Sequence, residues 1–380
     1  MKYYLIAGEA SGDLHGSNLI HGLKMYDPDA EFRGWGGDRM RDEGLELFKH
    51  YRETAFMGIW EVLKNLNSVF LNLKQCRNDI MLWKPDVVIY IDYPGFNLRM
   101  AEFVKSRGIK SYYYISPKLW AWNASRVKKI KKYVDEMFVI FPFEKDFYAK
   151  YGYYNVHFEG NPLIDAIEEQ RAELPNRETF LKDAGLDDKP IIALLAGSRK
   201  QEISKILPEM VKVSGQFPAY QFVLAGAPSI DESYYRSFEL AGVRLVTGKT
   251  YDILQHSNAA IVTSGTATLE TALFNVPQVV CYKTSSFSYN VGIHFLKIPY
   301  FSLVNIIMGR EVVKEILQFD LDVKISAELK QILENDTYRS KMLNSYKELR
   351  VISGGSGASR KVAEKIIKCL NPPVTASDDI

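Results

Sequence analysis

Short apolar runs alternate with amphipathic stretches along most of the chain. Runs at 2–7, 87–91 and 191–196 are rich in Ile, Leu, Val and Tyr, and each stops at a glycine or an aspartate. Such a run, bounded by turn residues, is typical of a strand that is buried on both faces. Strands that alternate with helices at this spacing form parallel sheets. The pattern therefore predicts an α/β protein with two doubly wound, Rossmann-like domains that face each other across a cleft.

The composition changes once, between the two halves of the pattern. Residues 168–190 are charged, contain prolines and are only weakly periodic, so we expect a linker there. It would separate an N-terminal domain, 1–167, from a C-terminal domain, 191–352. A glycine-rich turn opens the segment 353–370, which we expect to be a helix that packs back on the N-terminal domain. We expect residues 371–380 to be a disordered tail.

Two strand-to-helix turns in the second half have the character of phosphate sites. In LLAGSRKQEISKIL, 194–207, a strand ends at Gly197, and a helix pattern begins after Ser198 and Arg199. A helix N-terminus offers free N–H groups, glycine lets the backbone approach a ligand, and arginine can bind a phosphate through two hydrogen bonds. The alternative is that Gly197 only turns the chain.

The second turn is SGTATLETALFNVP, 264–277, in which Ser264, Gly265 and Thr266 precede a helix that carries Glu270. A carboxylate in this position can bind the hydroxyls of a ribose. The helix could instead place small side chains against the sheet. Two turns of this kind in one domain favour a nucleotide diphosphate.

Acidic side chains follow the strands of the first half. The turn AGEASGD, 7–13, contains Glu9 and Ser11 but is not GxGxxG, which argues against a dinucleotide. Ser11 or Asp13 could simply cap the next helix. Asp92 follows the strand 87–91, and ligands of open α/β sheets bind at the carboxyl ends of strands. Asp92 is therefore a candidate general base, with capping of a loop as the alternative.

Two segments of the first half could contact a membrane. The segment 57–74 is an amphipathic helix pattern that includes Trp60 and Phe70; core packing is its simpler interpretation, and an interfacial helix is the alternative. A basic helix pattern then follows two tryptophans. Its side chains could bind anionic lipid or form a solvated face. The residues of this second segment are Trp120, Trp122, Arg126, Lys128, Lys129, Lys131 and Lys132.

The overall composition excludes several other classes of protein. The 48 basic and 46 acidic residues give a net charge of +2, which does not indicate a nucleic-acid partner. Cys76, Cys281 and Cys369 are far apart and form no CxxC motif, which argues against a disulfide framework or a zinc site and suits a reducing cytoplasm. The N-terminus does not resemble a signal peptide, and no apolar run approaches the roughly 20 residues of a membrane span.

Taken together, the motifs resemble those of bacterial lipid-A-disaccharide synthases, which are inverting glycosyltransferases of the GT-B architecture. The resemblance covers nearly the whole chain and rests on eight stretches in the same order: AGEASGD, MGIWEVL, IDYPGFN, SPKLWAW, FPFEKDFY, LLAGSR, SGTATLE and SLVNIIMGRE.

The resemblance implies a reaction and a set of residue roles. It implies transfer of 2,3-diacylglucosamine from its UDP derivative to the 6-hydroxyl of 2,3-diacylglucosamine 1-phosphate, without a metal or other cofactor. Asp92 would be the general base, with Glu9 and Ser11 in the same cleft. The turns at Gly197–Arg199 and Ser264–Thr266 would bind the diphosphate, Glu270 the ribose, and Asn305 the leaving group or donor sugar. Because both substrates carry acyl chains, a cytoplasmic protein bound peripherally to the inner membrane is expected.

The chain also departs from the family pattern, and two other functions stay open. Gly95 stands where the family usually has an aspartate, which leaves Asp92 as the only acid of that turn. His15 replaces an aliphatic residue and is an alternative base or an ordinary loop histidine. The alternative functions are a UDP-sugar 2-epimerase of the same fold and a non-catalytic UDP-binding membrane protein. A homodimer is also left open.

Overall fold

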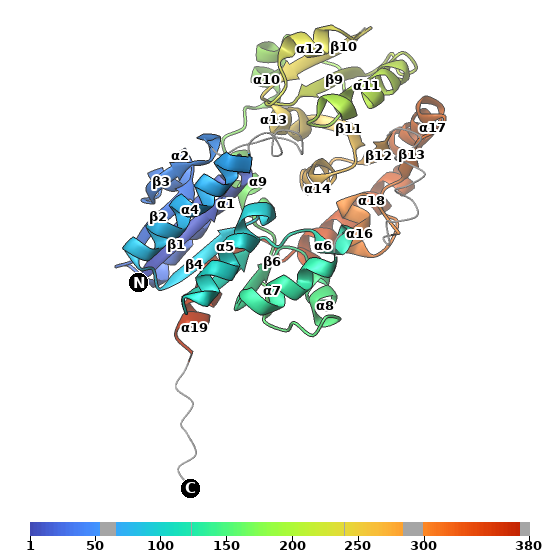
Figure 1. Cartoon of the computed structure of the whole chain (residues 1–380). Coiled ribbons are helices and arrows are strands. Elements are labelled where there is room, and N and C mark those ends of the chain that lie inside the picture. Colours follow the sequence, from blue (N-terminus) through green and yellow to red (C-terminus); the bar gives the residue numbers. More distant parts are fainter. Residues whose placement is uncertain (54–65, 123, 239, 284–298, 373–380) are drawn as a thin grey trace. The chain divides into compact units, whose positions relative to one another are not determined.

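The computed structural model describes residues 1–53, 66–122, 124–238, 240–283 and 299–372 (Figure 1). The chain forms two compact units. Unit 1 comprises Met1–Ala166 and Ser353–Ile380, and unit 2 comprises Ile167–Ile352. Each unit contains one sheet whose strands are all parallel, so the predicted pair of doubly wound α/β units is confirmed.

The sheet of unit 1 has the strand order β3-β2-β1-β4-β5-β6-β7. Its strands are β1 Lys2–Ala7, β2 Glu31–Gly36, β3 Glu46–His50, β4 Val87–Ile91, β5 Lys110–Tyr114, β6 Glu136–Val139 and β7 Val156–Phe158. The helices are α1 Ala10–Tyr26, α2 Asp38–Asp42, α4 Leu66–Trp83, α5 Pro94–Ser106, α6 Leu119–Trp122, α7 Val127–Tyr133, α8 Phe143–Ala149 and α19 Ala358–Leu370, with short 3₁₀ turns at Tyr51–Glu53 and Ala124–Arg126. Helix α9, Pro162–Arg171, spans the boundary between the units.

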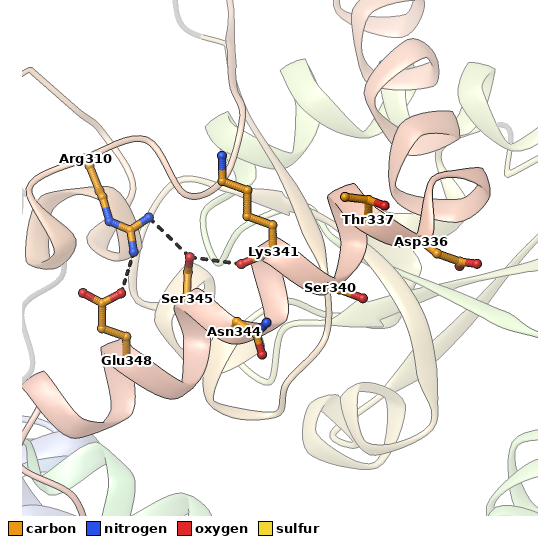
Figure 2. Close-up of a pocket in the computed structure, with 8 residues that line it drawn as sticks. All are labelled: Arg310, Asp336, Thr337, Ser340, Lys341, Asn344, Ser345 and Glu348. Carbon is orange, nitrogen blue, oxygen red and sulfur yellow. Dashed lines mark hydrogen bonds and ion pairs between the residues drawn. The ribbon is translucent and has the colours of Figure 1, made fainter.

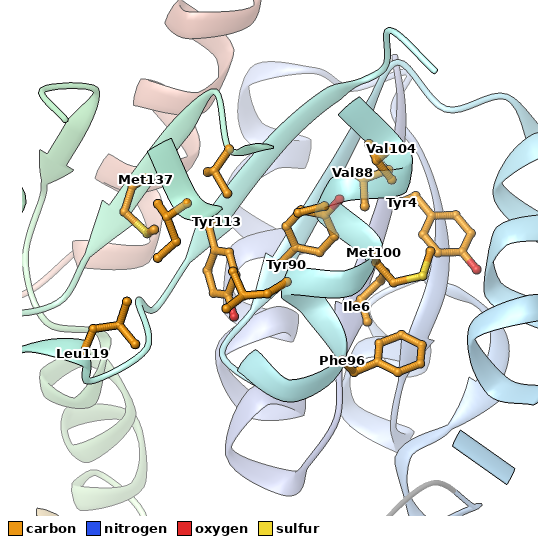
Figure 3. Packing of buried hydrophobic residues seen from close by; sticks show 14 of the residues in the cluster. Tyr4, Ile6, Val88, Tyr90, Phe96, Met100, Val104, Tyr113, Leu119 and Met137 are labelled. Carbon is orange, nitrogen blue, oxygen red and sulfur yellow. The ribbon is translucent and has the colours of Figure 1, made fainter. Parts of the chain in front are cut away.

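Successive residues of each strand point to opposite faces of this sheet, and both faces are buried. Tyr4 and Ile6 pack in the layer that includes residues of α4, α5 and α7, whereas Tyr3 and Leu5 pack in the layer of α1 and α19. Figure 3 shows the first layer, in which the rings of Tyr90 and Tyr113 come from neighbouring strands. This double burial explains why the central strands β1 and β4 are almost entirely apolar.

The last helix packs on the N-terminal unit, as predicted. Helix α19 lies against α1 and buries Val362 and Ile366 in the same core layer. Gly22 allows this close approach, because a Cβ atom there would lie 3.0 Å from that of Ala363. Asp165 accepts hydrogen bonds from the backbone N–H groups of Gly357 (2.6 Å) and Ser359 (3.0 Å), and so caps α19.

The sheet of unit 2 has the strand order β10-β9-β8-β11-β12-β13. Its strands are β8 Ile191–Leu195, β9 Gln221–Gly226, β10 Val243–Thr247, β11 Ser257–Thr263, β12 Gln278–Tyr282 and β13 Glu315–Leu317. Its helices are α10 Arg177–Ala184, α11 Lys200–Ser214, α12 Glu232–Arg236, α13 Thr250–Gln255, α14 Thr266–Leu273, α16 Leu303–Met308, α17 Leu321–Glu334 and α18 Asp336–Ile352.

Some details differ from the sequence-based expectations. The edge strands β3 and β7 are short and were not predicted. The apolar stretch 137–143 has the pattern of a single strand, but it forms only the end of β6 and then the start of α8, because Pro142 is the N-cap of that helix. In α4 the predicted apolar stripe is wrong in part: Phe70 is 68% exposed, whereas Asn72 is buried and accepts a hydrogen bond from Lys49 (2.7 Å).

Candidate active site

The strand order of each sheet reverses direction at one point, which creates a crevice at the carboxyl ends of two strands. In unit 1 the reversal lies between β1 and β4, which are followed by Glu9 and Asp92. In unit 2 it lies between β8 and β11, which are followed by Gly197 and Ser264. The two pairs of residues predicted from the sequence therefore flank the two switch points.

The backbone around Asp92 is strained. Asp92 (φ 45°), Tyr93 (φ 49°) and Ile115 (φ 62°) all have left-handed conformations, which cost energy for residues other than glycine. Two buried donors hold the peptide in place: the carbonyl oxygen of Asp92 accepts hydrogen bonds from Asn97 Nδ2 (2.7 Å) and from the Tyr113 hydroxyl (2.6 Å). Asn97 lies in the first turns of α5, so the start of this helix positions the donor that holds Asp92.

Burial and a neighbouring acid shift the titration of Asp92. Burial and the charge of Glu9 raise the pKa of Asp92 to about 6, while Lys118 and the Tyr93 N–H oppose the shift. Glu9 is itself exposed and accepts a hydrogen bond from the Ser11 hydroxyl (2.6 Å). A carboxylate with a pKa near neutrality suits a general base. Lys118, which sequence reasoning missed, belongs to the same electrostatic cluster.

The residues after Glu9 have other roles than the expected capping of α1. No described side chain caps α1. Asp13 is buried and instead accepts hydrogen bonds from the N–H groups of Gly37 (2.7 Å), Arg39 (3.2 Å) and Met40 (3.1 Å) at the start of α2. Burial lowers the pKa of His15 to about 4, so its ring is neutral at physiological pH.

Glu144 organises the loop after β5, a role the sequence did not reveal. Its buried carboxylate accepts hydrogen bonds from the Ser116 hydroxyl (2.5 Å), Trp120 Nε1 (3.3 Å), and the N–H groups of Ile140 (3.2 Å) and Phe141 (3.0 Å). Burial raises the pKa of Glu144 to about 7, although the hydrogen bonds from these donors act in the opposite direction. Trp120 is partly buried, and this hydrogen bond fixes the orientation of its indole ring.

In unit 2 the two predicted turns present free helix N-termini. Gly197 (φ 102°) and Gly265 (φ 151°) take conformations that favour glycine, and no described side chain caps α11 or α14. Ser198 and Thr266 are exposed, and the Ser264 hydroxyl donates to the carbonyl of Phe301 (2.8 Å). The uncapped N–H groups can bind phosphate oxygens.

A cation and a carboxylate accompany these turns. Arg199 is 81% exposed and forms an ion pair with Glu202 one turn later (3.2 Å). Its guanidinium can therefore reorient toward a ligand at little cost. Glu270 is partly buried and accepts a hydrogen bond from the Tyr251 hydroxyl (2.9 Å), and burial raises the pKa of Glu270. Both residues lie next to the turns that carry the free N–H groups.

Asn305 lies in a different environment from the one expected for a direct ligand contact. It is fully buried, and its amide nitrogen donates to the carbonyl of Val313 (2.9 Å) and to Glu315 (2.8 Å). Its amide oxygen accepts from the N–H groups of Val312 (2.7 Å) and Val313 (3.0 Å). In this structure the Asn305 side chain holds the segment before β13, and contact with a donor would require some of these bonds to break.

A polar hollow of about 750 Å³ on α18 lies elsewhere in unit 2 (Figure 2). Arg310 reaches across it to Glu348 (2.6 Å) and Ser345 (3.3 Å). Arg339, on the same helix, donates to the carbonyl of Asn258 (2.9 Å) near the start of β11. The hollow is therefore associated with the amino ends of the strands, away from the two predicted turns, and its lining cation Arg310 is already paired with Glu348.

Comparison with known proteins gives the family. Residues 3–368 match the family described as "Lipid-A-disaccharide synthetase". The chain belongs to this family. It is 39% identical to the lipid-A-disaccharide synthase of Myxococcus xanthus, with 98% of each chain covered, and 38% identical to that of Coxiella burnetii, with 95% of this chain and 96% of the relative covered. The family consists of glycosyltransferases of lipid A biosynthesis, so the resemblance inferred from the motifs is confirmed.

Solved structures confirm the fold. The Staphylococcus aureus MnaA–UDP co-structure superimposes with a TM-score of 0.69 at 14% identity, with 97% of both chains covered. A UDP-GlcNAc 2-epimerase from Neisseria meningitidis, bound to UDP-GlcNAc, gives 0.65 at 15% identity and covers 97% of this chain and 100% of its own. At these identities the likeness concerns the fold alone, whereas the full-length synthase relatives favour the transferase over the epimerase alternative.

The residues predicted for a membrane surface of this family member are only partly described. Trp60 lies outside the described residues, and so does the Trp122 side chain. Helix α7 buries Val127 and Ile130, Arg126 is partly buried, and Lys128, Lys129, Lys131 and Lys132 are exposed. None of the described helices combines the length and apolar character that a membrane-crossing segment needs.

A groove of about 390 Å³ between α4 and α5 combines apolar and basic side chains. The exposed Phe70 lines it together with Phe103, over whose ring Arg77 and Arg107 lie at 5.2 and 5.4 Å. The cations that line the groove are Lys74, Arg77, Arg99 and Arg107. The Tyr133 hydroxyl of α7 donates to Glu102 on α5 (3.0 Å), so the basic helix is linked to the helix that forms one wall of the groove.

Proposed function

We propose that this protein transfers 2,3-diacylglucosamine from UDP-2,3-diacylglucosamine to the 6-hydroxyl of 2,3-diacylglucosamine 1-phosphate with inversion. The products are a β-1,6-linked disaccharide 1-phosphate and UDP. The observation that carries the proposal is the half-buried Asp92 at a sheet switch point, whose pKa is raised to about 6 in a chain of the lipid-A-disaccharide synthase family.

Asp92 accepts the proton of the acceptor hydroxyl as the oxygen attacks the anomeric carbon of the donor. The bond from that carbon to the diphosphate breaks on the opposite face, which inverts the configuration, and UDP leaves. The strained peptide at 92–93, held by Asn97 and Tyr113, fixes the carboxylate before substrate arrives. Glu9 raises the proton affinity of Asp92, and Ser11 orients Glu9 through their hydrogen bond.

Unit 2 binds the UDP part of the donor. The uncapped N–H groups at the starts of α11 and α14, in the turns Gly197–Arg199 and Ser264–Thr266, donate hydrogen bonds to the diphosphate. Arg199 turns from Glu202 toward the charge that develops on the leaving group. Glu270 accepts hydrogen bonds from the ribose hydroxyls. These groups replace the metal ion that other phosphate-binding sites use, so the proposed reaction requires no metal.

The outer face of α4, α5 and α7 binds the inner membrane, where both acylated substrates reside. The four cations of the groove and the four exposed lysines of α7 favour binding to anionic headgroups. Apolar contacts come from Phe70 and Leu82, whose side chains are 68% and 82% exposed. The protein would thus act from the cytoplasmic side as a peripheral membrane protein.

The decisive experiment incubates the purified protein with both substrates and follows disaccharide and free UDP. The expected result is one UDP released per disaccharide formed, and no UDP release without the acceptor. Interconversion of the UDP-sugar in the absence of acceptor would instead indicate an epimerase. UDP binding without either reaction would indicate a non-catalytic binding protein.

A further inference from the structure

Three side chains with different ligand atoms converge near one edge of the sheet of unit 1. Glu136 begins β6, His157 lies on the edge strand β7, and Cys369 lies in the last turn of α19. Their ligand atoms all lie within 4.8 Å of one another, and all three residues are partly buried. His157 Nε2 lies 2.6 Å from Glu136 Oε2 and 3.9 Å from Cys369 Sγ.

The topology explains why these residues meet. His157 is paired with Phe138 in the β6–β7 ladder, and the Phe138 side chain faces α19. Glu136, two residues before Phe138, points to the same face of the sheet. The ring of His157 packs on Phe138 with centroids 5.2 Å apart, which fixes the imidazole beside the end of α19. The convergence therefore depends on the docking of the C-terminal helix.

The cysteine spacing argued against a zinc site because it lacks a CxxC motif, but here the ligands come from three separate elements. This ligand set and its spacing suit a zinc-like ion. A tetrahedral Zn²⁺ ion with sulfur, nitrogen and oxygen ligands holds these atoms about 3.3–3.6 Å apart. The observed separations of 2.6 and 3.9 Å lie on either side of this range, so small side-chain rotations would bring all three atoms into place. A thiolate and a carboxylate together neutralise a divalent ion, and a mixed S/N/O set favours Zn²⁺ over Mg²⁺ or Ca²⁺.

We propose that Glu136, His157 and Cys369 form a binding site for a zinc-class divalent cation that fastens the end of α19 to the sheet of unit 1. Water completes the coordination. Binding breaks the Glu136–His157 hydrogen bond: Nε2 gives up the proton it shares with the carboxylate while Nδ1 takes one up from solvent, so the ring binds as neutral imidazole. The Cys369 thiol releases its proton to solvent. The site is structural: Glu136 opens β6 at its amino end, whereas Asp92 follows β4 at its carboxyl end.

Cobalt titration of the full-length protein tests the proposal. Chelator-treated wild-type protein should bind one equivalent of Co²⁺, with a thiolate-to-metal charge-transfer band that Zn²⁺ abolishes. The Cys369→Ser variant should lose the band and bind Zn²⁺ at least about tenfold more weakly. Cys281→Ala is the matched control: Cys281 is fully buried in unit 2, and its removal should leave the band unchanged.

A second measurement needs no variant and covers the case in which Cys369→Ser does not fold. Zn²⁺ should protect one thiol of the native wild-type protein from alkylation, and peptide mapping should identify it as Cys369. Absence of the cobalt band at stoichiometric metal, its persistence in Cys369→Ser, or alkylation of Cys369 at an unchanged rate with Zn²⁺ would each overturn the proposal.

Discussion

Replacing Asp92 by asparagine should make the protein more stable and nearly inactive, and both effects should depend on pH. The side chain keeps its shape but can no longer ionise. Removal of a general base typically costs about 10²–10⁴-fold in rate. UDP binding should survive, because the proposed nucleotide site belongs to the other unit.

The size of the stability effect follows from the shift in titration. In the folded protein, burial and Glu9 raise the pKa of Asp92 from its ordinary value of 3.8 to about 6. A shift of this size corresponds to about 3 kcal/mol, and the part of the carboxyl group that water reaches reduces this to about 1–2 kcal/mol. Below pH 4 the carboxyl group is protonated in both the folded and the unfolded states, so it does not lower the free energy of unfolding. The loss in the free energy of unfolding develops between pH 4 and 6, as the unfolded state ionises first, and is complete above pH 6.

Two measurements on the same variant test this reasoning. Chemical denaturation of wild-type and Asp92→Asn protein should give equal free energies of unfolding at pH 4, and a more stable variant at pH 7.5. In the wild type, kcat/KM should fall below pH 6 as the base becomes protonated, whereas the residual activity of the variant should lack this fall. A stability difference that is the same at both pH values would refute the electrostatic argument. Full activity of the variant would remove Asp92 from the mechanism.

Three further predictions concern other parts of the site. Arg199→Ala should weaken UDP binding about 10–100-fold, measured by calorimetry. The control is Lys330→Ala, which removes an exposed cation paired with Glu334 on α17 and should leave UDP binding unchanged. Glu144→Gln places an amide against four donors and should lower the free energy of unfolding by about 1–3 kcal/mol and change Trp120 fluorescence; the exposed Glu169→Gln should stay within about 0.5 kcal/mol of the wild type. Glutamate at the four exposed lysines of α7 should reduce sedimentation with anionic vesicles at low salt, and unchanged sedimentation would make α7 an ordinary solvated face.

The family and the fold class could be predicted from the sequence because both depend on local pattern. Apolar runs that stop before Gly197, Ser264 and Asp92 place these residues at the carboxyl ends of strands, and within each sheet the parallel strands bring such ends to the same edge. The short edge strands β3 and β7 escaped prediction, because three to five residues at an edge carry too weak a periodicity. For Asn305 the sequence does not distinguish between an amide that holds a loop and one that binds a ligand, because the two look the same in sequence.

The sequence by itself determined the alternation of strands and helices, the positions of the turns and the chemistry available at each. Only the tertiary structure decided how residues far apart in the chain act on one another. It buried Glu144 among four donors from separate segments, and it raised the pKa of Asp92 by burying this residue and setting Glu9 beside it. It also brought Cys369 to His157 and Glu136 across more than two hundred residues. The physical reason is that burial and charge act through space, so they exist only after the sheet and its covering helices have formed.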